Sequence, residues 1–254
     1  MNKINKINKI VIVASGKGGV GKSTIAAGIS VALARQGFKT GIMDADIYGP
    51  SIPVLFGDQD NSKNIIDTEN GKKLVPSERY GVKIQSIGYL VKMDQSVIWR
   101  GPMASNAIKQ LIDDTEWGEL DYLIIDTPPG TGDIHITLMQ DYNIDNVIIV
   151  TTPQLMALSD VRKAISMYKK SYNIKNIGIV ENMSWFTPSE HKNEKYFIFG
   201  KGGADLLSSE FNIPVIAQIP IDESICANCD SGFLNGLFGK EEMESTYDKI
   251  LDFI

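Results

Sequence analysis

A glycine-rich string near the start of the chain has the residue types and the spacing that hold phosphate groups. It reads Gly16-Lys17-Gly18-Gly19-Val20-Gly21-Lys22-Ser23, a Gly, four residues and then Gly-Lys-Ser, which is the P-loop pattern. Glycines let backbone N–H groups turn inward around phosphate oxygens, and the helix expected after the string adds its dipole. We expect Lys22 to reach the β- and γ-phosphates of a nucleotide and the Ser23 hydroxyl to ligate Mg²⁺. The alternative interpretation is an ordinary glycine-rich turn.

Carboxylates at the ends of two apolar runs are placed to complete such a site. Asp126 ends the run that starts at Tyr122, which makes it the Walker B position, expected to hold Mg²⁺ through water. Asp44 and Asp46 end a second run, and alternation along a strand sends their side chains to the same side. A joint role of these two carboxylates requires that placement.

Asp133 closes the string Pro128-Pro129-Gly130-Thr131-Gly132-Asp133. We expect this string to be a switch segment that senses the γ-phosphate. Asp133 is also a candidate N-cap for a helix that starts at Ile134, and the two roles are compatible.

Strand-like and helical patterns alternate along the chain, and these elements must position the residues above. Six short runs rich in Ile and Val are typical of strands buried on both faces, at residues 10–14, 40–44, 122–126, 147–151, 177–181 and 215–219. Apolar residues recur at helical spacing in three stretches between them, at Ile25, Ile29, Ala32 and Leu33, at Ala104, Ile108, Leu111 and Ile112, and at Leu158, Val161, Ile165 and Tyr168. The alternation predicts an α/β fold with a doubly wound, mostly parallel sheet flanked by helices.

We predict a single domain at residues 10–254 behind a flexible segment at residues 1–9, because no Gly-, Pro- or Ser-rich linker divides the chain. Two stretches interrupt the simple alternation of strands and helices, at residues 51–118 and at the polar residues 183–197. Within the first stretch, residues 75–80 and 82–89 predict a hairpin. Insertions at strand carboxyl ends usually carry function in such folds.

An apolar stripe near the carboxyl terminus predicts a helix docked on the domain. Its residues are Met243, Tyr247, Ile250, Leu251 and Ile254. The opposite face is acidic, whereas helices that anchor proteins on anionic lipid are basic there.

Composition narrows the classes of function. The chain has 254 residues, of which 43% are hydrophobic and 22% charged, as in an ordinary soluble globular protein. The net charge is −6, whereas general nucleic-acid binding needs an excess of positive charge. No apolar run approaches the roughly 18 residues that span a bilayer, or the roughly 7–15 of a signal peptide. We therefore expect a cytoplasmic protein with no nucleic-acid and no membrane partner.

The wording Lys-Gly-Gly-Val-Gly-Lys at residues 17–22 resembles the deviant Walker A group of P-loop NTPases, which includes the MinD, ParA and nitrogenase iron-protein ATPases. The resemblance implies that Lys17 crosses a dimer interface and stabilises transition-state charge on the partner's nucleotide, as an arginine finger does. The alternative for Lys17 is a solvated loop lysine. The resemblance also implies that Asp44 lies behind the direct ligands of the metal and that Asp46 orients the attacking water.

Six longer strings follow one another in a fixed order. They are Met43-Asp44-Ala45-Asp46-Ile47-Tyr48-Gly49-Pro50-Ser51-Ile52-Pro53, Trp99-Arg100-Gly101-Pro102-Met103, Asp126-Thr127-Pro128-Pro129-Gly130-Thr131-Gly132-Asp133, Thr151-Thr152-Pro153-Gln154, Glu181-Asn182-Met183-Ser184 and Phe199-Gly200-Lys201-Gly202-Gly203. Together they resemble the Mrp/ApbC family of iron–sulfur cluster carriers within this group, over residues 10 to 235.

The resemblance implies a homodimeric ATPase that holds a labile cluster and passes it to apoproteins. Its cofactors are then ATP, Mg²⁺ and a 4Fe–4S cluster that bridges two subunits. Asn182 matches the position that reads the adenine edge, and Pro220 and Asp222 match the loop that flanks the base. The implied ATP-binding residues are Gly16, Lys17, Gly18, Gly19, Val20, Gly21, Lys22, Ser23, Thr24, Asn182, Pro220 and Asp222. The magnesium residues are Ser23, Asp44 and Asp126, and the catalytic residues are Lys17, Lys22 and Asp46.

The cysteines depart from the family pattern. The family usually places Cys-x-x-Cys shortly after Glu-Asn-Met-Ser, but here that stretch contains none, and the only two cysteines stand in Cys226-Ala227-Asn228-Cys229. Two cysteines exclude a disulfide framework, and their spacing suits half of a metal site. We expect both to be solvent-accessible and two chains together to supply four thiolates. A ligand from His191 or from outside is an alternative to the second subunit, and two soft thiols without any ligand are the other interpretation.

The sequence therefore predicts an ATP-binding, slowly hydrolysing dimeric carrier of iron–sulfur clusters. One competing class is a regulatory or positioning ATPase of the ParA/MinD kind, without a metal. The Trp-Arg-Gly-Pro-Met string and the acidic charge count against that class. Another is a family member that has lost cluster binding and acts as a scaffold, which the missing cysteine pair keeps open.

Overall fold

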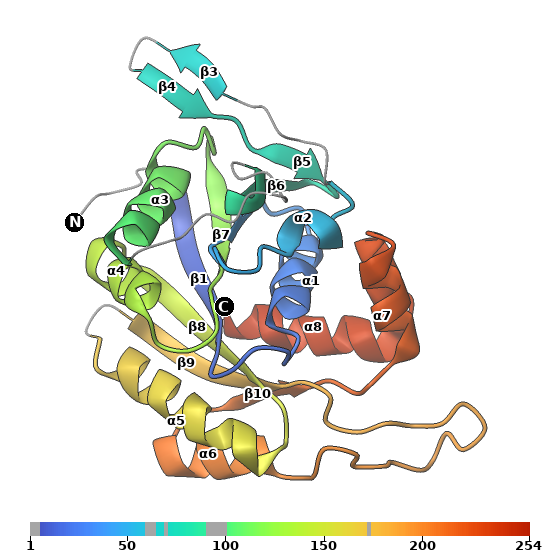
Figure 1. The fold of residues 1–254 in the computed structure, drawn as a ribbon. Coiled ribbons are helices and arrows are strands. Elements are labelled where there is room, and N and C mark those ends of the chain that lie inside the picture. The colour runs from blue at the N-terminus through green and yellow to red at the C-terminus, as the bar shows by residue number, and fades with distance from the viewer. Residues whose placement is uncertain (1–5, 59–64, 69–70, 90–100, 172–173) are drawn as a thin grey trace.

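A computed structural model describes residues 6–58, 65–68, 71–89, 101–171 and 174–254. Its main feature is an eight-stranded sheet with the order β10-β9-β8-β1-β7-β2-β6-β5 (Figure 1). The strands are β1 (Ile7–Ser15), β2 (Thr40–Asp44), β5 (Ser77–Arg79), β6 (Val82–Ser86), β7 (Leu120–Asp126), β8 (Ile144–Thr151), β9 (Ile174–Glu181) and β10 (Val215–Gln218). Every neighbouring pair is parallel except β5 and β6. This confirms the predicted fold class.

Helices cover both faces of the sheet (Figure 1). They are α1 (Lys22–Arg35), α2 (Ile52–Leu55), α3 (Gly101–Asp113), α4 (Asp133–Asp141), α5 (Leu155–Lys169), α6 (Gly203–Phe211), α7 (Glu223–Asp230) and α8 (Glu241–Phe253), with short 3₁₀ helices η1 (Ile87–Tyr89) and η2 (Leu234–Phe238). All three predicted helical stripes are buried in α1, α3 and α5.

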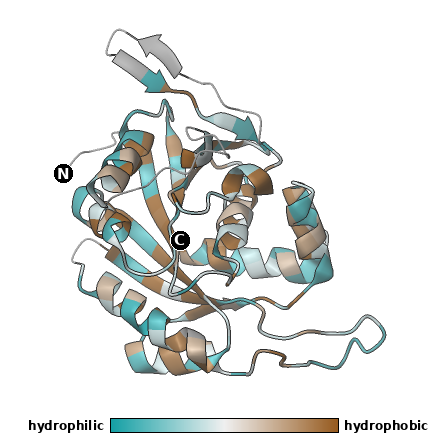
Figure 2. Ribbon diagram, viewed as in Figure 1, coloured by the Kyte–Doolittle hydropathy of each residue, from teal (hydrophilic) through white to brown (hydrophobic). Residues whose placement is uncertain are grey.

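Alternation along the central strand β1 creates two separate cores. Val11 and Val13 pack with α1, η2 and α8 on one face, while Ile10 and Ile12 pack with α3, α4, α5 and α6 on the other. Figure 2 shows hydrophobic residues concentrated along the strands and mixed with hydrophilic ones on the helices. A parallel sheet buried on both faces needs such continuous apolar strands, which is why the Ile- and Val-rich runs located them.

The hairpin predicted at residues 75–89 is confirmed in part. Strands β5 and β6 pair antiparallel around a turn at Tyr80 and Gly81, where both φ angles are positive, at 55° and 73°. Strand β6 also pairs in parallel with β2, and the last predicted strand residues form η1 instead. A second antiparallel pair, β3 (Ile65–Thr68) with β4 (Gly71–Leu74), was not predicted. Trp99 and Arg100 lie outside the described residues, which resume at Gly101, where α3 begins.

The two ends of the described chain differ in how well they match the sequence predictions. Strand β1 begins at Ile7, inside the predicted flexible segment 1–9, because its first residues pair with β7 from Leu120 onward. At the other end, α8 docks as expected, burying Met243, Tyr247 and Ile250 against the core. Among the described residues, no helix is both long enough and apolar enough to cross a bilayer.

Candidate functional site

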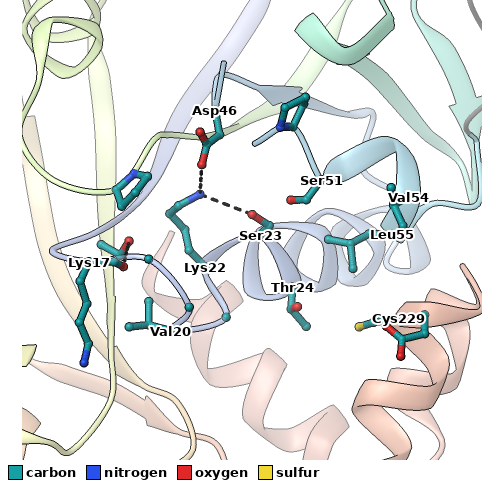
Figure 3. A pocket seen from close by; sticks show the side chains of 17 residues that line it. Lys17, Val20, Lys22, Ser23, Thr24, Asp46, Ser51, Val54, Leu55 and Cys229 are labelled. Atoms are coloured by element: carbon teal, nitrogen blue, oxygen red, sulfur yellow. Dashed lines mark hydrogen bonds and ion pairs between the residues drawn. The ribbon is translucent and has the colours of Figure 1, made fainter. Parts of the chain in front are cut away.

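The glycine-rich string forms the loop between β1 and α1 and one wall of a cavity. Gly19 and Gly21 have φ angles of 77° and 84°, values that L side chains rarely adopt. Gly21 is the N-cap of α1 and supplies no side-chain hydrogen bond, so the first N–H groups of the helix face the loop without a capping side chain. The cavity measures about 390 Å³ (Figure 3). Besides residues of the loop and of the α1 start, its lining includes Asp46, Pro50, Ser51, Val54, Leu55, Pro129, Cys229 and Asp230.

Lys22 is only 7% exposed and lies among oxygen atoms at the bottom of this loop. Its Nζ donates to Asp126 Oδ1 at 2.6 Å. It also donates to Ser23 Oγ at 3.4 Å and stands 4.0 Å from Asp46 Oδ2, the two interactions that Figure 3 marks. The structure thus brings together the lysine, the hydroxyl and two of the three carboxylates that the sequence singled out.

Asp44 is buried behind the cavity, and its carboxylate accepts hydrogen bonds from the protein itself. Its Oδ1 accepts from the Asp46 N–H at 3.1 Å, and its Oδ2 accepts from the Ile52 N–H and the Ser86 hydroxyl, both at 3.1 Å. The structure ends β2 at Asp44, so strand alternation does not extend to Asp46, which turns toward Lys22. Asp44 therefore fixes the chain after β2, whereas Asp46 faces the cavity.

The three carboxylates carry more negative charge than Lys22 balances. Burial, followed by repulsion from Asp126, raises the pKa of Asp44 to about 7. Burial also raises the pKa of Asp126 and Asp46, against the opposing effect of Lys22. Asp126 Oδ2 is buried and accepts no hydrogen bond within the described part of the chain. An unsatisfied buried carboxylate oxygen in a site short of positive charge suits a cation.

The donor set fits Mg²⁺ better than a metal held by protein alone. Among the described residues, no three His, Cys, Asp or Glu side chains form a metal cluster. Mg²⁺ is usually bound by one or two carboxylates together with substrate phosphates and waters. Asp126, with its open oxygen, and Ser23 match that requirement, while both oxygens of Asp44 are already occupied.

Lys17 turns away from the cavity floor where Lys22 lies (Figure 3). Its Nζ donates to Gln154 Oε1 at 3.0 Å, and Gln154 is the N-cap residue of α5. The ammonium is therefore engaged by Gln154, and the role of Lys17 at a partner's nucleotide stays a prediction. The string Thr151-Thr152-Pro153-Gln154 was noted in the sequence, but nothing in it identified Gln154 as the acceptor for Lys17.

Asn182 lies against the loop rather than in the cavity. Its Nδ2 donates to the Val20 carbonyl at 2.9 Å, and a Cβ at Gly21 would come within 2.2 Å of that nitrogen. Gly21 is thus required both by its backbone angles and by this close approach. Pro220 and Asp222 follow β10, and the Asp222 side chain caps α7 by accepting from the Ser224 N–H at 2.9 Å. The roles of these three residues around a base stay predictions.

Asp133 begins α4, but it does not cap it. The N-cap is Gly132, which corrects the interpretation of Asp133 as the capping residue. Its carboxylate points toward the start of α3, since a Cβ at Gly101 would lie 2.3 Å from Asp133 Oδ2. An acidic side chain in the first turn still complements the helix dipole.

The two cysteines lie on α7 in different environments, which corrects the expectation that both are accessible. Cys226 is exposed and its thiol donates to Asp230 at 3.6 Å. Cys229 is 7% exposed, belongs to the core on the α1 side of the sheet, and contacts the Thr24 side chain. Helix α7 packs on α2 and η2, so its inner surface is covered. Burial raises the pKa of Cys229, and Asp230 raises the pKa of Cys226. His191 is exposed and lies 3.4 Å from Glu194.

Comparison with known proteins gives consistent results. A family model described as "ParA: NUBPL iron-transfer P-loop NTPase" matches residues 6–254. The chain is 43% identical over 231 residues to an iron-sulfur cluster carrier protein of Aquifex aeolicus, covering 91% of this chain and 62% of that one. It is 47% identical over 227 residues to the carrier protein of Rickettsia felis, covering 89% and 66%. The chain thus spans less than two thirds of the length of these relatives.

Solved structures share the fold. A nucleotide-binding protein of Archaeoglobus fulgidus in complex with ADP superposes with a TM-score of 0.79 at 37% identity, covering 99% of this chain and 94% of that one. The cell division ATPase MinD of Pyrococcus furiosus superposes with a TM-score of 0.64 at 21% identity, covering 97% and 100%. The second likeness concerns the fold alone.

Proposed function

The chain belongs to the iron-transfer P-loop NTPases of the ParA/NUBPL family, and from this membership we propose what it does. It binds ATP with Mg²⁺, hydrolyses it slowly as a nucleotide-linked homodimer, and carries an iron–sulfur cluster to apoproteins. The observation that carries the nucleotide part is the cavity over residues 16–24, with the buried Lys22 at its floor and the uncapped start of α1 facing it. The ADP bound to the A. fulgidus relative supports the same conclusion.

Within this proposal, different groups of the chain bind the phosphates, hold Mg²⁺ and orient the attacking water. Backbone N–H groups of the loop and the Lys22 ammonium bind the phosphates. Mg²⁺ held near Ser23 and Asp126 would neutralise charge on the β- and γ-phosphates. Asp46, half-buried at the cavity and 4.0 Å from Lys22, orients the attacking water.

A second copy of the chain completes the site. Lys17 contributes to the cavity wall, but its ammonium is held by Gln154 away from the groups around Lys22, so its charge is available to a partner's nucleotide. Exposed apolar side chains surround this edge of the sheet, at Tyr48, Met103, Ile136, Leu155 and Met156. Leu155 and Met156 stand side by side in the sequence and are 73% and 85% exposed, and contiguous exposed apolar side chains mark interaction surfaces. Together these features support a dimer that meets across the nucleotide sites.

The cluster is the cargo of the protein, and we propose the two cysteines as its ligands. Of the two cysteines, Cys226 is exposed, while Cys229 is buried and lines the cavity. Four-thiolate coordination therefore requires both a second chain and a movement of α7 that turns Cys229 outward. The burial of Cys229, like the missing cysteine pair after Ser184, favours the scaffold alternative, in which no cluster is bound.

An anaerobic reconstitution with iron and sulfide tests the proposal. Wild type is expected to take up about four irons per dimer and to show thiolate-to-iron absorbance. Cys226→Ser should abolish uptake while ATP hydrolysis continues, because Cys226 does not line the cavity. His191→Ala is the matched control and should take up as much iron as wild type. If Cys226→Ser takes up as much iron as wild type, the cluster site lies elsewhere in the chain. If wild type takes up no iron, the scaffold alternative replaces the carrier function.

A further inference from the structure

The segment between β7 and α4 has few backbone donors with which to hold its position. It contains Pro128 and Pro129 in succession, and proline has no N–H. The backbone anchors on this side are the Thr127 N–H to the Val13 carbonyl at 3.2 Å and the Gly130 N–H to the Ser15 carbonyl at 2.8 Å. Pro129 lines the cavity, and Asp126 directly precedes the segment. The Thr127 hydroxyl also donates to the Val13 carbonyl, at 2.9 Å. The placement of the segment therefore matters to the site, and these bonds hold its two ends at Thr127 and Gly130 while the Pro128 carbonyl between them needs a donor from elsewhere.

A buried histidine supplies the missing anchor. His135 in α4 is 1% exposed, and its Nε2 lies 3.1 Å from the Pro128 carbonyl oxygen. Its Nδ1 lies 2.6 Å from the hydroxyl of Tyr168, a fully buried residue of α5. A carbonyl can only accept, so Nε2 must carry the proton and Nδ1 must accept from the tyrosine. The result is a directed chain of hydrogen bonds from α5 through α4 to the proline segment.

We propose that His135 is a positioning residue for ATP hydrolysis, which holds the segment 127–130 in place through Pro128 and is itself oriented by Tyr168. The inference rests on the proposed function, since it assigns His135 to the same site. The ring nitrogens of His135 bond to Tyr168 and Pro128, outside the loop residues 16–24, and the Lys22 charge acts on the ring only through repulsion. We therefore expect phosphate binding to depend little on His135. Its effect falls on turnover, through the position of Asp126 and Pro129, and not on nucleotide affinity.

Three variants separate this role from that of an ordinary core residue. His135→Gln keeps a donor for the Pro128 carbonyl, His135→Leu keeps most of the volume without a donor, and Tyr168→Phe removes the hydroxyl that orients the ring. ADP affinity should stay within about twofold in all three. The turnover number should fall about tenfold in His135→Leu, the size expected for loss of one buried hydrogen bond. The turnover number of His135→Gln should be close to that of wild type. The turnover number of Tyr168→Phe should lie between those of His135→Leu and His135→Gln.

Amide hydrogen exchange gives a second measurement that does not depend on ATPase activity. Exchange at Gly130 and its neighbours should speed up in His135→Leu and Tyr168→Phe but not in His135→Gln. Equal turnover and equal exchange in the Leu and Gln variants would overturn the proposal, and so would equal losses of affinity and turnover. A ¹⁵N spectrum of wild type that places the proton on Nδ1 would overturn it as well. If wild type hydrolyses no ATP, the proposed function fails, while the exchange comparison and the spectrum still decide whether His135 holds the segment.

Discussion

On the proposed function, Lys22 is the residue on which nucleotide binding should depend most. Its ammonium pairs with Asp126 at 2.6 Å, so phosphate must compete with that carboxylate for its charge. Charge-assisted contacts of this kind contribute roughly 1.5–3 kcal/mol each. We predict that Lys22→Ala lowers ATP affinity at least about tenfold in calorimetry.

Lys17→Ala is the matched control for that prediction, because it removes the same charge from the same loop. Its side chain is held by Gln154 outside the phosphate position, so this variant should bind ATP nearly as wild type does. A folded Lys22→Ala protein with wild-type affinity would contradict the assigned site.

Cys229 and Cys226 should respond differently to nucleotide. Cys229 lines the cavity beside Thr24, whereas Cys226 is exposed on the same helix. We predict that iodoacetamide at alkaline pH labels Cys226 at the same rate with or without ADP, and that ADP slows labelling of Cys229. Mass spectrometry of the peptide resolves the two sites. ADP protection should disappear in Lys22→Ala, and unprotected Cys229 in a protein with ADP bound would place the nucleotide elsewhere.

His135 also makes stability depend on pH. Burial lowers its pKa to about 4, so the folded ring stays neutral while an unfolded histidine protonates near its usual value of 6.5. The unfolded state then binds more protons between these values, and stability falls as the pH drops through this window. We predict that wild type loses about 1–2 kcal/mol more than His135→Gln between pH 7 and pH 5. Urea unfolding of both proteins at the two pH values measures this, and parallel losses would show that the folded His135 also protonates.

At the level of single residues, the sequence predicts which groups form the phosphate site but not how they pair. The Gly-x4-Gly-Lys-Ser spacing locates the loop because backbone geometry dictates it. The burial of Cys229 was not predictable, because it depends on how α7 packs on α2 and η2. The same holds for His135, because its partner Tyr168 lies 33 residues further along the chain, on another helix.

Among the elements, the long excursion between β9 and α6 depends on one buried carboxylate. Glu181 ends β9 and is 1% exposed. Its Oε1 accepts from the Ser184 hydroxyl and from Gln218 Nε2, both at 3.0 Å, and its Oε2 accepts from the Ala204 N–H at 2.8 Å. Glu181 therefore joins both ends of residues 182–203 to the sheet.

We predict that Glu181→Ala destabilises the protein by about 2–4 kcal/mol, because the buried Ser184 hydroxyl and Ala204 N–H lose their acceptor together with the exposed Gln218 amide. Glu181→Gln should cost less, since one of its terminal oxygens can still accept. Urea unfolding measures both, and limited proteolysis should cut within residues 185–200 faster in the alanine variant. An alanine variant as stable as wild type would show that water replaces the carboxylate without loss.

The sequence locates the main elements well and the peripheral ones poorly. Strand β2 has the predicted ends, at Thr40 and Asp44, because a strand buried on both faces must be apolar throughout. Strands β3 and β4 were not predicted, because residues such as Asp67, Lys72 and Lys73 interrupt any apolar pattern. The pairing of β6 with β2 depends on contacts far apart in sequence, which local patterns do not encode.

For the whole molecule, the central claim is that one chain holds the nucleotide and a second chain completes the site. In each chain the Lys17 side chain bonds to Gln154 and is proposed to act on the partner's nucleotide, whereas Asp46 lines the cavity of its own chain. Removal of either should leave ATP binding intact and lower hydrolysis, because both act on the transition state.

ATP hydrolysis by an equal mixture of Lys17→Ala and Asp46→Ala tests this claim most directly. Random pairing makes half of the dimers mixed, and each mixed dimer has one intact site out of two. The account predicts that the mixture recovers about a quarter of wild-type activity while each variant alone is nearly inactive. A mixture no more active than the separate variants would contradict it, because Lys17 would then act within its own chain or not at all.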